Sequence, residues 1–151
     1  MTGTLFTVRE DMRVLAAVRS LLKHRLSGAP VVDDQGLLIG MLSERDCIHA
    51  LVRAVVERLP SSYVRDVMTT DVLTISESAD LLSIAHIFVT RPMRRIPVVD
   101  EERHLVGQIS RHDLLATAVA VWDEAPSRQA AVLYLSATGR VTPFHHHGRR
   151  V

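Results

Sequence analysis

The feature that most constrains the fold is a short segment that occurs twice in the chain. Residues 40–46, Gly-Met-Leu-Ser-Glu-Arg-Asp, return as residues 107–113, Gly-Gln-Ile-Ser-Arg-His-Asp, so the glycine, serine and aspartate each recur 67 positions later (107 − 40). One copy of such a motif is a weak signal, but two copies in register indicate an internal repeat. The chain is therefore expected to fold as two similar units.

The repeat extends well beyond this segment. When residues 5–50 are laid on residues 72–117, the identical pairs cluster at expected strand ends and helix starts: Thr7/Thr74, Glu10/Glu77, Leu15/Leu82, Pro30/Pro97, Val31/Val98, Val32/Val99, Asp33/Asp100, Leu38/Leu105, Gly40/Gly107, Ser43/Ser110 and Asp46/Asp113. A unit of about 46 residues has little interior of its own. We therefore expect the two units to pack against each other as a pseudo-twofold pair, through the apolar faces of their sheets.

Hydrophobic spacing predicts the order β-α-β-β-α in each half, an α/β (α+β) fold. In the first half it predicts a strand at 5–8, a helix over 12–26 stopped by Ser27-Gly28, and strands at 30–32 and 37–42 around a turn at 33–36. A helix capped by Ser43 then runs to about residue 59.

In the second half the corresponding elements are a strand at 72–75, a helix opened by Glu77 and stopped at Arg91-Pro92, a strand from Pro97, and a helix capped by Ser110. A connector with one helical turn, residues 63–70, joins the halves. The expected domains are residues 4–59, a linker 60–71, residues 72–121, and a partly ordered C-terminal tail, 122–151.

Composition excludes several classes of protein. The formal net charge is only +1 over 151 residues, which argues against nucleic-acid binding. The amino terminus does not resemble a secretory signal, and the longest apolar stretches are shorter than the ~20 residues that span a bilayer. Because Cys47 is the single cysteine, an intrachain disulfide is impossible, and we expect a soluble protein of the reducing cytoplasm.

The repeated Ser-x-x-Asp admits two interpretations. A serine at a helix N-cap with an acid three residues later is a capping box. Aspartate is shorter than the Glu or Gln that this box prefers, so we expect it to reach back less well and to be free to face a ligand. Its carboxylate would accept hydrogen bonds from both ribose hydroxyls, while the free amides at the helix start attract phosphate. Two copies in register favour the ligand interpretation.

The repeats also carry a family resemblance. Residues 28–34, Gly-Ala-Pro-Val-Val-Asp-Asp, and residues 94–100, Arg-Arg-Ile-Pro-Val-Val-Asp, together with the connector, resemble a tandem pair of cystathionine-β-synthase (CBS) domains, or Bateman module, over residues 4–121. The resemblance implies a regulatory module that binds AMP, ADP, ATP or S-adenosylmethionine in up to two clefts between the repeats. It also implies a homodimer without catalytic activity.

In that family each cleft takes its Ser-x-x-Asp from one repeat and its first strand and pre-proline segment from the other. The resemblance therefore implies a first cleft of Ser43, Arg45, Asp46, Val72, Leu73, Thr74, Met93, Arg94, Arg95 and Pro97. It implies a second cleft of Ser110, His112, Asp113, Leu5, Phe6, Thr7, Leu26, Ser27, Gly28 and Pro30. Three arginines lie in the first set and suit phosphate oxygens, so we predict tighter binding there.

Other candidate sites are weaker. Cys47 lies just inside a helix start, where its pKa could be lowered, but a buried apolar role is favoured. His145-His146-His147 is a candidate for a transition metal or an incidental feature of the tail. His24, His49, His86 and His104 share no metal-ligand spacing, and no Walker loop or catalytic triad pattern is found.

The leading hypothesis is a stand-alone sensor of adenine nucleotides that shifts the arrangement of a dimer, with a separate protein effector reading the change. The runner-up is a structural or interaction dimer with empty clefts, in which Ser43 and Ser110 only cap helices. An enzyme and a nucleic-acid-binding protein come third and fourth.

Overall fold

The computed structural model describes residues 5–58 and 62–130. By their contacts these residues form two compact units. The first unit contains residues 5–58, 62–72 and 103–105, and the second contains residues 73–102 and 106–130. Each unit has a three-stranded sheet and an apolar core of its own.

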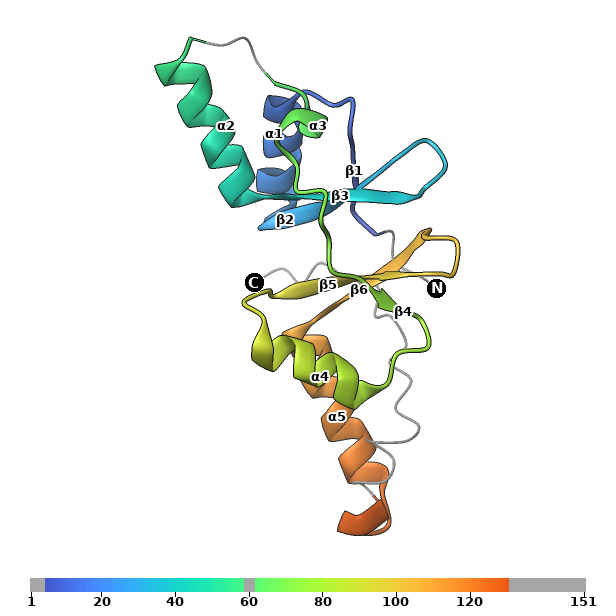
Figure 1. Ribbon diagram of the computed structural model, residues 1–151. Coiled ribbons are helices and arrows are strands. Elements are labelled where there is room, and N and C mark those ends of the chain that lie inside the picture. The colour runs from blue at the N-terminus through green and yellow to red at the C-terminus, as the bar shows by residue number, and fades with distance from the viewer. Residues whose placement is uncertain (1–4, 59–61, 131–151) are drawn as a thin grey trace. The chain divides into compact units, whose positions relative to one another are not determined.

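The first unit is built from three strands and three helices. In chain order they are β1 (Val8–Arg9), α1 (Val14–His24), β2 (Gly28–Val32), β3 (Leu38–Ser43), α2 (Glu44–Val56) and α3 (Val64–Val67). The sheet order is β1-β2-β3, with β1 parallel and β3 antiparallel to β2. Helices α1 and α2 lie on the same face of this sheet (Figure 1).

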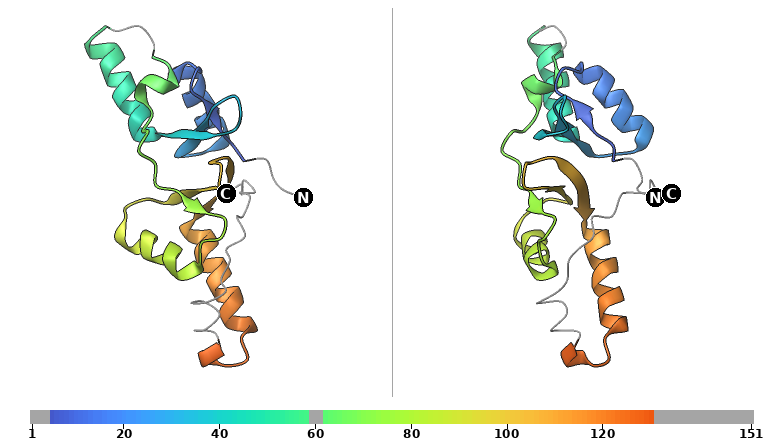
Figure 2. Two further views of the ribbon diagram at one scale, coloured as in Figure 1. Left: turned by 45° about the vertical axis from the view of Figure 1, so that its right-hand side comes forward. Right: turned by 90° about the vertical axis from the view of Figure 1, so that its right-hand side faces the viewer.

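The second unit repeats this plan. Its elements are β4 (Ile75–Ser76), α4 (Leu81–Thr90), β5 (Arg95–Val99), β6 (Leu105–Ser110, whose first residue groups with the first unit) and α5 (Arg111–Glu124). The sheet order is β4-β5-β6, with β4 parallel to β5. Helices α4 and α5 cover one face of the sheet in both views of Figure 2. The predicted order β-α-β-β-α and the mixed fold class are confirmed, while the packing of the two sheets against each other stays a prediction.

The two cores use equivalent positions of the repeat. Val31 and Leu42 in the first core correspond to Val98 and Ile109 in the second, and all four side chains are buried. Side chains alternate along a strand, so Leu42 and Ile109 face the helices of their own units. Their neighbours on β3 and β6, including the serines that end both strands, face the opposite side of each sheet.

The predicted entry strands were too long and began too early. Residues 5–7 and 72–74 are not strands, because β1 and β4 pair with their neighbours over only two residues each. A hydrophobic run does not by itself show where hydrogen bonding to a parallel neighbouring strand begins. The sequence therefore could not limit these strands to Val8–Arg9 and Ile75–Ser76.

Two helix boundaries also differ from the prediction. Helix α1 ends at His24, because the next residue, Arg25, has a left-handed φ of 54° that stops the helix before Ser27-Gly28. Helix α4 starts after Asp80 rather than at Glu77, because the Asp80 carboxylate accepts a hydrogen bond from the Ser83 N–H at 2.8 Å. That bond lowers the pKa of Asp80 below its usual value.

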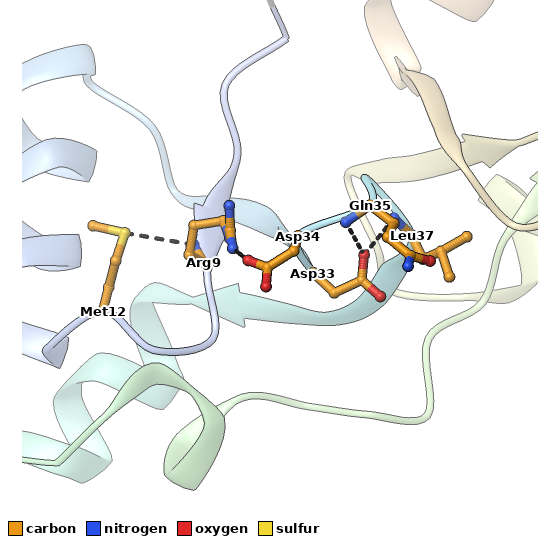
Figure 3. Close-up of polar contacts among 6 residues, drawn as sticks. All are labelled: Arg9, Met12, Asp33, Asp34, Gln35 and Leu37. Atoms are coloured by element: carbon orange, nitrogen blue, oxygen red, sulfur yellow. Dashed lines mark hydrogen bonds and ion pairs between the residues drawn. The ribbon is translucent and has the colours of Figure 1, made fainter.

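The hairpin between β2 and β3 confirms the predicted turn at 33–36. The Asp33 carboxylate accepts hydrogen bonds from the backbone N–H groups of Gln35 and Leu37 at 2.8 and 2.9 Å (Figure 3). Gly36 adopts a φ of 81°, which an L-residue rarely takes. An ion pair between Arg9 and Asp34 ties β1 to the same turn. This turn sets where β3 runs, and thereby where its last residue, Ser43, lies.

The described residues of the connector contribute to the core of the first unit. Val64 is fully buried in the core of that unit, with Val67 and Met68 packed against it. The guanidinium groups of Arg13 and Arg65 each lie 4.3 Å from the centre of the Tyr63 ring, a distance suited to cation–π attraction. The start of α3 is thus fixed to the start of α1.

Candidate functional site

The first Ser-x-x-Asp forms the junction between β3 and α2. Ser43 ends the strand and caps the helix, with extended backbone angles (φ −102°, ψ 162°). Its Oγ accepts a hydrogen bond from the Asp46 N–H at 3.1 Å, and Asp46 Oδ2 accepts one from the Ser43 N–H at 2.9 Å. The capping box is complete.

The second copy has the same geometry at the start of α5. Ser110 Oγ accepts from the Asp113 N–H at 3.1 Å, and Asp113 Oδ2 accepts from the Ser110 N–H at 2.8 Å. The expectation that aspartate reaches back poorly was therefore wrong. Ser43 and Ser110 sit in extended backbone that brings their own N–H groups to the carboxylate, so the shorter side chain suffices.

Each aspartate can still accept hydrogen bonds from a ligand, although its helix cap is complete. The bond to the serine N–H uses Oδ2, and Oδ1 of Asp46 and of Asp113 accepts no hydrogen bond from the residues that the structure describes. A carboxylate held in this way is already oriented, so it loses little freedom when it binds. The helix start adds a positive end of the dipole, which favours anions. Each copy can therefore hold a hydroxyl-bearing, anionic molecule.

Each motif lies beside the pre-proline segment of its own repeat. The Glu44 N–H donates to the Ser27 carbonyl at 2.9 Å, and Gly28 is paired with Ser43 across the sheet. In the second unit the Arg111 N–H donates to the Arg94 carbonyl at 3.3 Å. The combinations predicted across the two repeats stay predictions.

Gly28 makes this close approach possible. A Cβ atom at residue 28 would lie 2.8 Å from the Leu42 carbonyl oxygen, which belongs to the backbone and cannot turn away. The close approach of β3 therefore requires glycine at position 28. No ligand is needed to explain the presence of glycine there.

The other predicted site residues differ in their exposure. Arg45, Arg94, Ser27 and His112 are exposed; Pro30 and Pro97 are buried; and Leu5, Phe6, Thr7, Leu26, Val72, Leu73, Thr74, Met93 and Arg95 are half-buried. Leu26 and Met93 pack against the cores of their own units. These two residues therefore stabilise the cores of their own units, whether or not they also contact a ligand.

One residue beside the predicted set was missed. The ring of His24 lies 4.7 Å from that of Phe6, and its Nδ1 is 2.8 Å from the Ser20 carbonyl oxygen. The hydrogen bond to a carbonyl requires Nδ1 to carry the proton. His24 thus helps to position Phe6. The sequence carried no signal for this contact, since His24 shares no spacing with other candidates.

The connector passes beside the first motif. Met41 and Thr69 exchange two backbone hydrogen bonds of 2.9 Å, which places the segment leading to Val72 along β3, two residues before Ser43. Gly40 allows this pairing, because a Cβ atom there would lie 2.9 Å from the Thr69 carbonyl oxygen and 2.8 Å from the Met68 sulfur.

Gly40→Ala is therefore expected to lower the free energy of unfolding by about 2 kcal/mol, the usual cost of overpacking a fitted contact. Chemical denaturation of the variant and the wild-type protein measures this difference. An unchanged midpoint and slope would show that the connector does not depend on close contact with β3.

Cys47 is half-buried, which is less than the fully buried apolar role that the sequence favoured. It packs against the core of the first unit, and its counterpart in the second repeat is the buried Leu114. Burial, together with the carboxylates of Asp46 and Glu44, raises the pKa of the Cys47 thiol above its usual value. The alternative of a lowered pKa was wrong, because desolvation and the two acids outweigh the helix start.

A raised pKa leaves less thiolate at neutral pH, and the thiolate is the reactive form. We expect an aromatic disulfide reagent at pH 8 to label Cys47 at least tenfold more slowly in the folded protein than in guanidinium chloride. Since Cys47 is the chain's one cysteine, the signal has one source. Equal rates in both conditions would contradict a protected thiol.

Among residues 5–58 and 62–130, no group of three or more His, Cys, Asp or Glu side chains is arranged to hold a metal ion. The candidate at His145-His146-His147 lies outside the described residues. Within the described part of the chain, no helix has the length and apolar character to cross a membrane.

Comparison with known proteins places the chain in a family. A family model described as the CBS domain matches residues 1–53 and 64–120. The uncharacterized protein MJ1225 of Methanocaldococcus jannaschii is 32% identical over 122 residues, which are 81% of this chain and 42% of that protein. An inosine-5'-monophosphate dehydrogenase of the same organism is 32% identical over 111 residues, 74% of this chain but 21% of the enzyme. The chain thus spans less than half the length of these two relatives.

Two solved structures share the fold. CBSX2 of Arabidopsis thaliana, determined in complex with AMP, matches with a TM-score of 0.69 and 27% identity, over 79% of this chain and 90% of that chain. The cytosolic domain of the Mg2+ channel MgtE, in complex with ATP, matches with a TM-score of 0.63 and 31% identity, over 74% and 44%. With two units of one plan, each ending in a capped Ser-x-x-Asp, the chain belongs to the CBS domain family as a tandem pair.

Proposed function

We propose that this chain is a regulatory module that binds adenosine-containing ligands, namely AMP, ADP, ATP or S-adenosylmethionine. The observation that carries the proposal is the pair of capping boxes, each of which keeps Asp46 or Asp113 oriented with one carboxylate oxygen available. The AMP complex of CBSX2 and the ATP complex of MgtE support this class of ligand.

The first cleft would combine Ser43, Arg45 and Asp46 with residues 72–74, 93–95 and 97. Its entry segment begins next to the motif, since Thr69 is paired with Met41. The second cleft would combine Ser110, His112 and Asp113 with residues 5–7, 26–28 and 30. In each, Asp binds the ribose hydroxyls, the helix start meets the phosphate, and the apolar entry residues lie against adenine.

The first cleft would bind nucleotides more tightly. Arg45 and Arg94 are exposed, so their guanidinium groups are accessible to phosphate oxygens. At the positions of Arg94 and Arg95 the other repeat has Ser27 and Gly28, which bring no charge.

The chain would act as a homodimer. Along α2, five apolar side chains form an exposed stripe, the α2 apolar face: Ile48, Leu51, Val52, Val55 and Val56. Exposed apolar stripes of this kind mark interaction sites. A second copy is the occupant that we propose, because α5 carries a further set, Leu115, Val119 and Trp122, at which another copy's α2 apolar face would be buried.

The output would be regulatory rather than catalytic. In one relative, the inosine-5'-monophosphate dehydrogenase, the part that aligns with this chain makes up 21% of the enzyme. A ligand that prefers one dimer arrangement shifts the population toward it, and a separate protein effector would respond. The single cysteine suits the reducing cytoplasm.

Calorimetric titration of the purified chain with AMP, ADP, ATP and S-adenosylmethionine, after removal of bound small molecules, tests the proposal. We expect saturable binding of at least one of them. The alternative is a structural dimer with empty clefts, in which Ser43 and Asp46 only satisfy each other at the start of α2. Absence of heat and of co-purified nucleotide would support that alternative.

A further inference from the structure

The helices of the two units carry opposite net charges. In the first helix layer, made of α1 and α2, α1 with its cap residues has four Lys or Arg and no Asp or Glu, and α2 with its caps has two Lys or Arg and three Asp or Glu, which leaves a formal net charge of +3. In the second helix layer, made of α4 and α5, α4 with its caps has one Arg and one Asp, and α5 with its caps has one Arg and three acids, which leaves −2.

The outer side of α1 combines this positive charge with exposed leucines. Leu15 and Leu22 are 56% and 72% exposed. Arg19 follows Leu15 by four residues and precedes Leu22 by three, so the three side chains share one face of the helix. Arg19 and Lys23 are exposed as well. The helix thus presents an apolar pair bordered by basic side chains.

The second helix layer has the apolar pair without the basic side chains. The positions of α4 that follow Leu15, Arg19 and Leu22 by 67 residues are Leu82, His86 and Val89. Leu82 and Val89 are 52% and 84% exposed on α4. The acids at the end of α5, Asp123 and Glu124, are also exposed.

Two copies of the chain can join through their helix layers in two ways. Head to head, each layer meets the same layer of the other copy, so +3 faces +3 and −2 faces −2. Head to tail, the first layer of each copy meets the second layer of the other, and the charges are opposite. Like charges brought together at an interface are unfavourable and exclude the wrong arrangement. The apolar pairs suit both arrangements, so charge selects the head-to-tail one.

We propose that a second copy of this chain docks head to tail, with Leu15 and Leu22 of α1 against Leu82 and Val89 of α4 in the other copy. This inference rests on the proposed homodimer, whose interface it extends from the α2 apolar face to α1, and it assigns the orientation of the copies. Residues 131–151 contain three arginines and no Asp or Glu, so their charge does not suit them to cover α1 instead.

Crosslinking of cysteine variants tests the orientation. Leu15→Cys, Leu22→Cys, Leu82→Cys and Val89→Cys are each made in a Cys47→Ala background, which removes the chain's one native cysteine. The variants are mixed in pairs, allowed to exchange subunits and treated with a short bismaleimide. We expect covalent dimers when an α1 variant is mixed with an α4 variant, and none when two α1 variants or two α4 variants are mixed.

The crosslinking results separate this inference from the proposed homodimer. Covalent dimers formed by two α1 variants would show a head-to-head dimer and overturn the orientation. A dimer seen by sedimentation velocity that no mixture crosslinks would place α1 outside the interface and overturn the inference while the homodimer stands. A monomeric wild-type chain would overturn both.

Charge reversal gives a second test, because the two arrangements predict opposite signs. Arg19→Glu/Lys23→Glu changes the first helix layer from +3 to −1. Head to tail, it should raise the dissociation constant of the dimer about tenfold at low salt, because α1 then meets acids. Asp123→Lys/Glu124→Lys in the same chain should restore the dimer. A lower dissociation constant after reversal on α1, measured by sedimentation velocity, would overturn the inference.

Discussion

Asp46→Ala is expected to weaken AMP binding at the tighter site by roughly 10- to 100-fold, because each hydrogen bond to a charged group contributes about 1.5–3 kcal/mol. The same change removes the acceptor of the Ser43 N–H, so it should also lower the free energy of unfolding by about 1 kcal/mol. Asp113→Ala should cost less in AMP affinity, since its cleft has fewer arginines. Calorimetric titration of the two variants measures the difference.

Asp46→Asn is the matched control for the cap. Its amide oxygen can still accept from the Ser43 N–H, while the second oxygen is replaced by an NH2 group. We expect near-native stability with strongly weakened AMP binding. A larger loss of affinity in Asp113→Ala than in Asp46→Ala would show that the arginines of the first set do not decide which cleft binds more tightly.

Val55→Asp is expected to raise the dissociation constant of the dimer at least 100-fold. Val55 is 69% exposed on the α2 apolar face, so the substitution should leave the folded protomer intact. In the dimer it would place an unpaired carboxylate in an apolar interface, where the cost of desolvation is large. Sedimentation velocity over a range of concentrations, with circular dichroism to verify folding, measures the effect.

His49→Asp supplies the control for charge on the same helix. His49 is exposed and lies outside the α2 apolar face, so its replacement should leave the dimer nearly unchanged. Equal sedimentation of Val55→Asp and the wild-type protein would remove α2 from the interface.

The architecture could be predicted because it is repeated. The 67-residue offset placed Pro30 with Pro97 and Ser43 with Ser110, and both pairs take the same structural positions. Element ends depend on tertiary partners, and they were predicted less well. Arg25 stops α1 because its backbone is left-handed, a conformation that arginine rarely adopts. The residue type therefore did not predict that the helix ends there.

The candidate site was predictable in part because its helix caps depend on local structure. Ser43 and Ser110 cap helices through local backbone geometry, which a short motif specifies. The reach of Asp46 to the Ser43 N–H was misjudged, because it depends on the extended backbone at the cap. The contact of His24 with Phe6 joins residues far apart in the sequence, which no motif of either repeat encodes.

Under the proposed function, each of the two Ser-x-x-Asp motifs forms half of a nucleotide site as well as a helix cap. The most direct test is calorimetric titration of the Asp46→Asn/Asp113→Asn double variant with AMP, at a temperature where circular dichroism shows it to be folded. We predict that the wild-type chain binds AMP and that the folded double variant does not bind it detectably. Wild-type affinity in the double variant would contradict the claim and leave both motifs as helix caps alone.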